Sequence, residues 1–151
     1  MIYTIGEMAK QLNIPASTIR YYDSQGLLPF VERSKSGVRL FQEKDYEWLR
    51  VIGCLKKTGL SLDEIKDYID LAMQGDQTLD QRLEMMLHQK EVLKQKIKEI
   101  NNALDVVDYK CWFYQTAKEK GSSEAVKNMP DDQLSKKHSQ TRTMLQRVNE
   151  N

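Results

Sequence analysis

A run of mostly apolar residues spaced alternately by four and three positions limits the possible folds of this chain more strictly than any other feature. The run consists of Leu79, Leu83, Met86, Lys90, Leu93, Ile97, Ile100, Leu104 and Val107. This heptad spacing is typical of a helix that pairs with another helix through one face. The same steps continue to Cys111 and Tyr114, so the run predicts a helix of roughly 36 residues and about 50 Å.

A helix of this length cannot bury its apolar stripe by itself. It could fold back on the preceding domain, but a domain of about 75 residues offers too short a surface. We therefore expect a homodimer in which the nine residues of the run, called the seam below, form the dimer contact. The heptads leave open whether the two helices are parallel or antiparallel. Lys90 is a charge within the seam, which should cost stability and specify register or orientation.

The composition indicates a soluble protein. Charged residues make up 30% of the 151 residues and the net charge is +1, while no apolar run approaches the roughly 20 residues that span a membrane. The start MIYTIGEMAK lacks the basic and apolar parts of a secretory signal, and the two cysteines form no disulfide framework. We therefore expect a cytoplasmic protein with no membrane partner. Any nucleic-acid surface must be a local basic patch.

The sequence contains no arrangement that suggests catalysis or a metal centre. His88 and His138 are isolated from other metal-binding residue types. No nucleophile, base and orienting group stand in a recognisable pattern. We therefore expect neither enzyme activity nor a metal or other cofactor.

Two short helices are predicted near the amino terminus. Thr4 and Glu7 form a capping box at the start of TIGEMAKQL. In the following IPASTIRYYDSQG, Pro15 suits a helix start and Gly26 a helix end. Two such helices joined by a tight turn match a helix-turn-helix, whose second helix enters the DNA major groove. One face of this second helix carries Ser17, Arg20, Tyr21 and Ser24.

A basic hairpin is predicted directly after these helices. In VERSKSGVRLF, apolar and basic residues alternate around an SG turn. The charged residues of this segment are Arg33, Lys35, Arg39 and Glu32. The excess of positive charge suits contact with phosphates. Such a segment alone is most often a solvated turn, but its position after a helix-turn-helix favours a DNA-binding wing.

Two further helices complete the amino-terminal domain. The first spans EKDYEWLRVIGCLKKTG and stops at Gly59, and the second opens on a capping box in SLDE. The predicted fold class is all-α with a small β-hairpin wing. Residues 1–75 form a winged helix-turn-helix domain and residues 76–120 a long coiled-coil dimerisation helix. Residues 121–151 form a polar tail that is weakly helical or disordered.

Three motifs follow one another in the first half of the chain, namely IRYYDSQGLL, GVRLF and TGLSLDEI. In this order and spacing they resemble the winged-helix DNA-binding domain of MerR-family transcription regulators. The resemblance implies that Arg20 and Tyr21 contact the DNA backbone and groove edges. It implies phosphate contacts for Lys35 and Arg39 of the wing, and for Lys57 on a neighbouring turn. The complete set of expected DNA-binding residues is Ser17, Thr18, Arg20, Tyr21, Arg33, Lys35, Arg39 and Lys57.

The same resemblance carries expectations about assembly and mechanism. It implies an antiparallel helix pair, with two DNA-binding domains related by a two-fold axis and a near-palindromic binding site. It also implies activation by distortion of promoter DNA, so that RNA polymerase is reached only through the DNA. The large effector domains of drug-binding members have no room in this chain. The paired cysteines of metal-binding members are missing after the long helix.

The two cysteines are the remaining candidates for receiving a signal. Cys111 lies on the continued seam in an aromatic segment, and we interpret it as a packing residue. Cys54 has Arg50 four positions before it and Lys57 three positions after it, and these cations favour a thiolate. The nearby carboxyl end of the helix disfavours an anion, so packing and sensing both stay open for Cys54. The resemblance adds that a short MerR subgroup with one cysteine after the wing senses aldehydes or other electrophiles.

We therefore predict a homodimeric transcription regulator that binds double-stranded promoter DNA sequence-specifically. It would activate transcription by distorting that DNA in response to a small thiol-reactive signal such as an aldehyde, with Cys54 as the sensor. The alternative is a non-switching DNA-architectural protein or a coiled-coil interaction protein. A transcriptional response to an effector distinguishes the two hypotheses.

Overall fold

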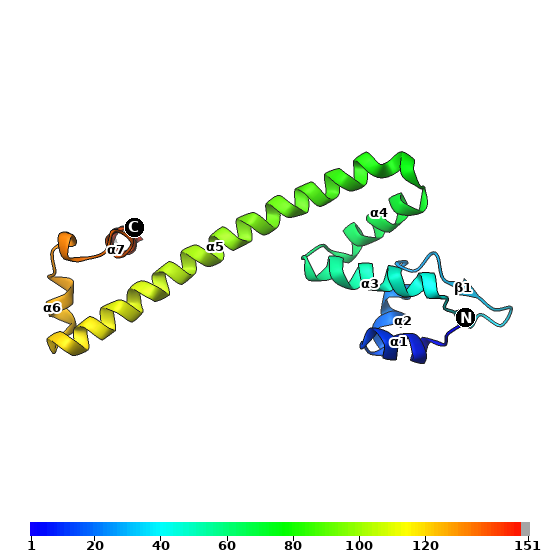
Figure 1. Cartoon of the computed structure of the whole chain (residues 1–151), viewed down its shortest axis with the longest axis horizontal. Coiled ribbons are helices and arrows are strands. Elements are labelled where there is room, and N and C mark those ends of the chain that lie inside the picture. Colours follow the sequence, from blue (N-terminus) through cyan, green and yellow to red (C-terminus); the bar gives the residue numbers. More distant parts are fainter. Residues whose placement is uncertain (149–151) are drawn as a thin grey trace. The chain divides into compact units, whose positions relative to one another are not determined.

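A computed structural model describes residues 1–148, which fall into two compact units. The first unit is Met1–Glu91 and the second begins at Val92. The long helix α5 (Leu79–Lys120) contributes residues to both units (Figure 1). Among residues 1–148, no helix combines the length and the apolar character that crossing a membrane requires.

The first unit is built from short helices and one hairpin, which confirms the predicted fold class. Its elements before α5 are α1 (Ile5–Leu12), α2 (Ala16–Ser24), β1 (Glu32–Arg33), β2 (Arg39–Leu40), α3 (Glu43–Lys57), α4 (Leu62–Met73) and the 3-10 helix η1 (Asp76–Thr78). Their apolar faces meet in one core. The most deeply buried side chains of this core are Met8, Ile19, Leu27, Phe41, Leu49, Ile52, Ile65 and Ile69.

Local sequence signals place the helix ends where they were expected. The Thr4–Glu7 capping box is present at α1, where the Thr4 hydroxyl accepts from the Glu7 amide at 3.3 Å and the Glu7 carboxylate accepts from the Thr4 amide at 2.7 Å. A second capping box joins Ser61 and Glu64 at α4. Gly26 has φ of 75°, a left-handed conformation that ends the α2 segment at little steric cost.

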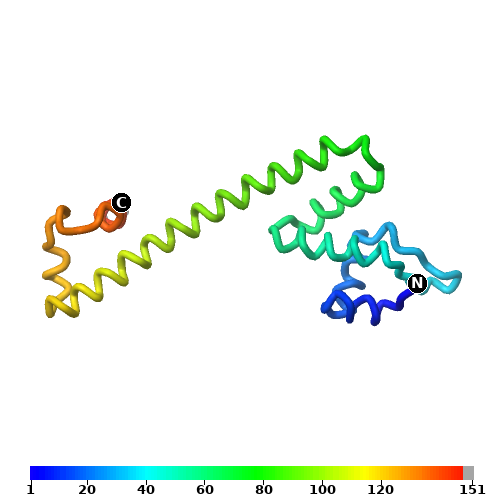
Figure 2. The backbone as a smooth tube through the Cα atoms, viewed as in Figure 1, coloured from blue at the N-terminus to red at the C-terminus, as the bar shows by residue number. Residues whose placement is uncertain are grey.

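The wing is a two-stranded antiparallel hairpin held at its base by the amino-terminal segment. Its register pairs Glu32 with Leu40 and Arg33 with Arg39. Just beyond β2, the Phe41 carbonyl accepts from the Tyr3 amide at 2.8 Å, which brings the amino-terminal segment alongside the hairpin (Figure 2). Because the Phe41 side chain is fully buried, the base of the wing is anchored in the core.

The second unit contains the end of α5 and the segment that follows it. Its further elements are α6 (Ser123–Lys127), the 3-10 helix η2 (Asp131–Gln133) and α7 (Lys136–Val148). Its core consists of Tyr109, Phe113, Val126 and Leu134. The Trp112 and His138 rings pack beside this core with their centroids 4.9 Å apart. The segment whose composition suggests a weak helix or disorder thus has apolar contacts of its own with α5.

The seam lies on a single uninterrupted helix, as the heptads predict. Its apolar side chains are largely exposed in the single chain. Those more than half exposed are Leu79, Leu83, Ile97, Ile100, Leu104 and Val107. Met86 differs, because it packs partly against the core of the first unit.

Candidate DNA-binding surface

Helix α2 presents one polar face and buries the other. Ile19 and Tyr22 are buried in the core of the first unit. This packing leaves the opposite face exposed, with Thr18 half-buried at its margin. The exposed residues are Ser17, Arg20, Tyr21 and Ser24. The helix therefore offers hydroxyl and guanidinium groups to a partner, as a recognition helix must.

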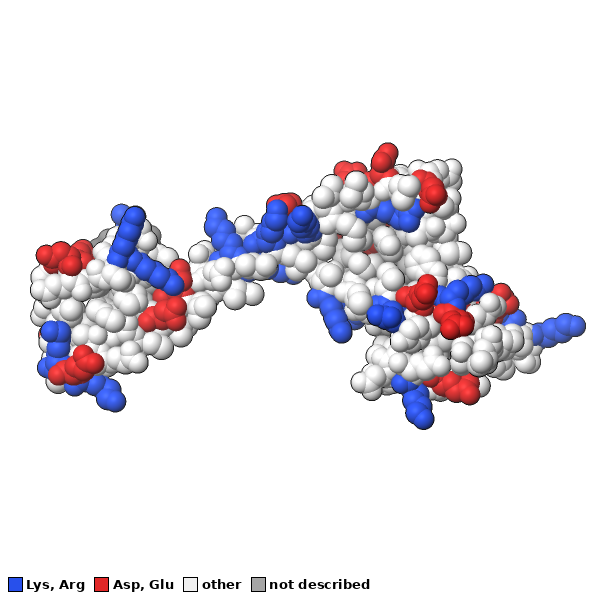
Figure 3. Space-filling view, viewed as in Figure 1, with Lys and Arg blue, Asp and Glu red and all other residues white. Residues whose placement is uncertain are grey.

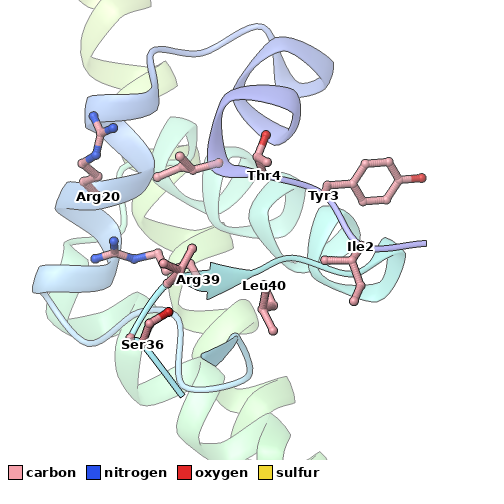
Figure 4. A pocket seen from close by; sticks show the side chains of 10 residues that line it. Ile2, Tyr3, Thr4, Arg20, Ser36, Arg39 and Leu40 are labelled. Carbon is pink, nitrogen blue, oxygen red and sulfur yellow. The ribbon is translucent and has the colours of Figure 1, made fainter. Parts of the chain in front are cut away.

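A hollow of about 430 Å³ lies between α2, the amino-terminal segment and the wing. Arg20 from α2 and Arg39 from β2 line it together with Tyr3 and Thr4 of the amino-terminal segment and with further residues of the wing. Figure 4 shows the two arginine side chains extending toward the same side of the hollow. Two of the residues expected to contact DNA are thus brought together although they are far apart in sequence.

Asp23 is a site residue that the sequence-based prediction missed. Its Oδ2 atom accepts hydrogen bonds from Arg33 Nη2 at 2.6 Å and from Arg39 Nε at 2.8 Å. Arg39 Nη2 makes a further short contact with the same oxygen. The sequence signal that could have identified Asp23 is an acidic residue on the helix that precedes an arginine-rich hairpin.

The remaining predicted cations lie elsewhere on the first unit. Lys35 is exposed in the turn of the wing, and Lys57 is the exposed last residue of α3. Lys57 does not line the hollow that contains Arg20 and Arg39. On the face drawn in Figure 3, basic side chains are interspersed with acidic ones, so positive charge is local.

Cys54 is exposed on α3 and lines a second hollow of about 330 Å³. Tyr22, Arg50 and Lys57 line the same hollow, so the two cations flagged by their helical spacing share this space with the thiol. Burial raises the pKa of the Tyr22 hydroxyl, which keeps it protonated and able to donate a hydrogen bond. Cys111, interpreted from sequence as a packing residue, is also exposed in the single chain.

A hydrogen bond connects the end of α3 to α5. The Thr58 amide donates to the Cys54 carbonyl at 3.2 Å. The Thr58 carbonyl in turn accepts from Gln89 Nε2 at 2.7 Å, and the Gln89 side chain is almost fully buried. Gln89 thus satisfies a backbone acceptor at a helix end, where carbonyls lack partners within the helix. It also joins the turn after Cys54 to the seam-bearing helix.

The helix pair, the attached wing and the arginine-lined hollow define a winged helix-turn-helix DNA-binding protein. The chain matches the models of the MerR HTH family regulatory protein over residues 3–72 and of the MerR DNA-binding region over residues 46–108. It is 43% identical to an uncharacterized HTH-type transcriptional regulator of Haemophilus influenzae, over 86% of this chain and 96% of that protein. The chain belongs to the MerR family of transcription regulators.

Two further similarities are to a regulator solved in complex with promoter DNA and to a regulator of Bacillus subtilis. The crystal structure of HiNmlR, described as a MerR family regulator lacking the sensor domain and bound to promoter DNA, matches with a TM-score of 0.67 and 43% identity. That match covers 86% of this chain and 98% of the HiNmlR chain. The regulator AdhR of Bacillus subtilis is 36% identical over 59% of this chain and 64% of its own length.

The hollow leads to a first prediction. Arg20→Ala and Arg39→Ala should each weaken binding to an operator duplex, defined here as DNA selected from a random pool by the wild-type protein. Each lost phosphate contact should reduce the slope of log affinity against log salt by about 1. Fluorescence anisotropy at several salt concentrations measures both quantities. Lys118→Ala, which removes a cation from the second unit, is the control, and unchanged affinity and slope in both arginine variants would reject this surface.

Proposed function

We propose that the protein is a homodimeric activator that binds promoter DNA and responds to a small thiol-reactive compound at Cys54. Promoter DNA as the partner is supported by the similarity to HiNmlR, whose crystal structure contains it. The arginine-lined hollow beside the polar face of α2 supplies groups suited to phosphates and groove edges. In this proposal the polymerase is influenced through distortion of the DNA, as the family resemblance implies.

The homodimer is supported by the exposed seam. Six of its apolar side chains are more than half exposed in the single chain, and a contiguous apolar stripe of this kind marks an interaction surface. A second copy of the same helix supplies a matching heptad stripe without requiring another protein. Two copies related by a two-fold axis would present two wings and two α2 helices to a near-palindromic site.

The observation that carries the sensor proposal is the position of Cys54 in a hollow shared with Arg50 and Lys57. Cys54 is exposed and therefore accessible to a small molecule, and the thiolate form of a cysteine is its nucleophile. With an aldehyde, the thiolate sulfur forms a bond to the carbonyl carbon, and the carbonyl π electrons move to oxygen. That oxygen then takes a proton from solvent, giving a neutral hemithioacetal.

The adduct would act on α5 through the turn after Cys54. The adduct adds heavy atoms beside Arg50 and Lys57, which line the same hollow as Cys54. Thr58 is hydrogen bonded to the Cys54 carbonyl on one side and to Gln89 on the other. A displacement of the α3 end would therefore reach α5 through the hydrogen bond from Gln89 to the Thr58 carbonyl. The usual allosteric coupling energy of about 1 to 3 kcal/mol would bias two dimer conformations by roughly 5- to 150-fold.

The test compares Cys54→Ser with the matched variant Cys111→Ser. Wild type and both variants should bind the operator duplex with similar affinity, because a regulator that acts by DNA distortion stays bound. Transcription from the cognate promoter should rise with formaldehyde or a longer aldehyde in wild type and in Cys111→Ser, but not in Cys54→Ser. Footprinting with and without the aldehyde reports the change in DNA distortion.

Two outcomes would contradict the sensor proposal. Retained induction in Cys54→Ser, or loss of induction only in Cys111→Ser, would show that Cys54 is not the sensor. A wild-type protein that binds the operator but never alters transcription would favour the non-switching architectural alternative.

A further inference from the structure

One acidic side chain holds both strands of the wing against α2. Arg33 lies on β1 and Arg39 on β2, and the register pairs them directly, so their side chains leave the same face of the hairpin. Both donate to one carboxylate oxygen of Asp23, at 2.6 Å from Arg33 Nη2 and 2.8 Å from Arg39 Nε. Arg33 Nη1 also donates to the Gly37 carbonyl at 3.3 Å, which ties it to the turn of the wing.

The cluster is partly shielded from water on the side of α2. The Asp23 side chain is 13% exposed, whereas the Arg39 and Arg33 side chains are 27% and 47% exposed. The acid is therefore mostly shielded from water, and the arginines keep more exposed surface. Charge-assisted hydrogen bonds of this kind are shorter and stronger than neutral ones, and they fix the plane of a guanidinium group.

The contact with Asp23 does not exhaust the donors of Arg39. Asp23 is bound through the edge formed by Nε and Nη2, and a guanidinium group has five N–H donors. The remaining donors are free to contact a phosphate without breaking the ion pair. Arg20 extends toward the same side of the hollow (Figure 4), so the pairing sets the position of Arg39 relative to Arg20.

We propose that Asp23 is a positioning residue that determines how strongly the protein prefers its operator over other DNA. It would hold Arg39 ready for a defined phosphate, so less side-chain freedom is lost when the operator binds. It would also reduce the attraction to arbitrary DNA, because Arg33, Arg39 and Asp23 together carry a charge of +1 and not +2. Non-specific binding depends almost entirely on such phosphate electrostatics.

The effect of removing the negative charge is expected to be opposite for the two kinds of DNA. In Asp23→Asn, a released arginine can follow any backbone, so the salt slope for non-operator DNA should steepen by about 1. The affinity of the variant for non-operator DNA, relative to that of wild type, then varies in inverse proportion to the salt concentration, so this relative gain is about tenfold larger at 0.1 M than at 1 M salt. Operator affinity should stay level or fall because the fixed geometry is lost. The ratio of operator to non-operator affinity, relative to that of wild type, should therefore be about tenfold lower at 0.1 M than at 1 M salt.

The experiment measures the affinity of the full chain for the operator duplex and for a scrambled duplex of equal length across a range of salt concentrations. Asp67→Asn is the matched control, since Asp67 is exposed on α4 and no ion pair involves it among residues 1–148. It removes the same charge and should shift both affinities equally. Asp23→Glu keeps the charge but lengthens the side chain, so it should restore the lost ratio only in part. A long-range charge effect alone would predict full restoration.

Four results would overturn the proposal. The first is an unchanged affinity ratio in Asp23→Asn, and the second is an equal gain for both duplexes, as expected for the Asp67→Asn control. The third is a wild-type protein that enriches no sequence from the random pool. Circular dichroism on all variants tests for misfolding, and a lower ratio in Asp23→Glu than in Asp23→Asn would also contradict a positioning role.

Discussion

Replacing Ile97 and Ile100 together with lysine should convert the protein to a monomer at micromolar concentration and reduce operator affinity by roughly 10²- to 10⁴-fold. Both side chains lie on the seam, and they are 59% and 66% exposed in the single chain. Lysine at two adjacent seam positions would place cations of both copies against an apolar surface. A monomer keeps one set of DNA contacts and loses the gain from joining two binding modules, which is of this size.

Sedimentation velocity and operator binding on the same samples check this result. Gln95→Lys with Asn102→Lys adds the same charge to α5 away from the seam, and this control should stay dimeric with a normal affinity. A monomeric wild type, or an Ile97/Ile100 variant that is still dimeric, would show that the seam is not the dimer contact.

The reverse change is Lys90→Leu, which should raise the thermal midpoint of the dimer because it removes a charge from the seam.

Phe41→Ala should lower the free energy of unfolding by about 3 to 5 kcal/mol, the usual cost of emptying the site of a buried aromatic ring. Phe41 is fully buried, and its backbone pairs with Tyr3 just beyond β2. The substitution should therefore also loosen the base of the wing. Denaturant titration at a fixed protein concentration measures the loss, since the stability of the proposed dimer would depend on concentration.

Val38→Ala is the control for this experiment. Val38 lies in the same hairpin but is largely exposed, so its loss should change stability by no more than about 0.5 kcal/mol. A loss below about 1 kcal/mol in Phe41→Ala would mean that the ring contributes little to the core. Equal losses in the two variants would place the stabilising contact in the hairpin itself.

Local signals in the sequence were sufficient to predict the elements of the first unit. The capping boxes at Thr4 and Ser61 act over three residues, and the heptads of α5 act along one helix. Each depends on atoms that are close in sequence, so it can be recognised without knowledge of the fold. The contacts of the segment after Gly121 are different, because they depend on Val126 and Leu134 meeting α5 residues across a turn.

The site was predictable to the extent that it consists of residue types in a known order. The polar face of α2 and the basic hairpin were identified, and the structure brings Arg20 and Arg39 to one hollow. The partnership of Asp23 with both wing arginines was not, since it joins positions 10 and 16 residues apart across two elements. Counting the charges of the hairpin alone therefore overestimated the positive charge available to DNA.

The hydrogen bond from Gln89 to the Thr58 carbonyl also bears on how regulators of this family can be recombined. The boundary between the two compact units falls inside α5, directly after Glu91 and two residues beyond Gln89. A chimera joined after residue 91 would keep the DNA-reading part with its own helix anchor and exchange everything beyond it. A junction placed earlier, at the start of α5, would separate Gln89 from Thr58 and remove the hydrogen bond to the Thr58 carbonyl. A junction that keeps this contact therefore lies within a continuous helix, and not at the boundary between η1 and α5.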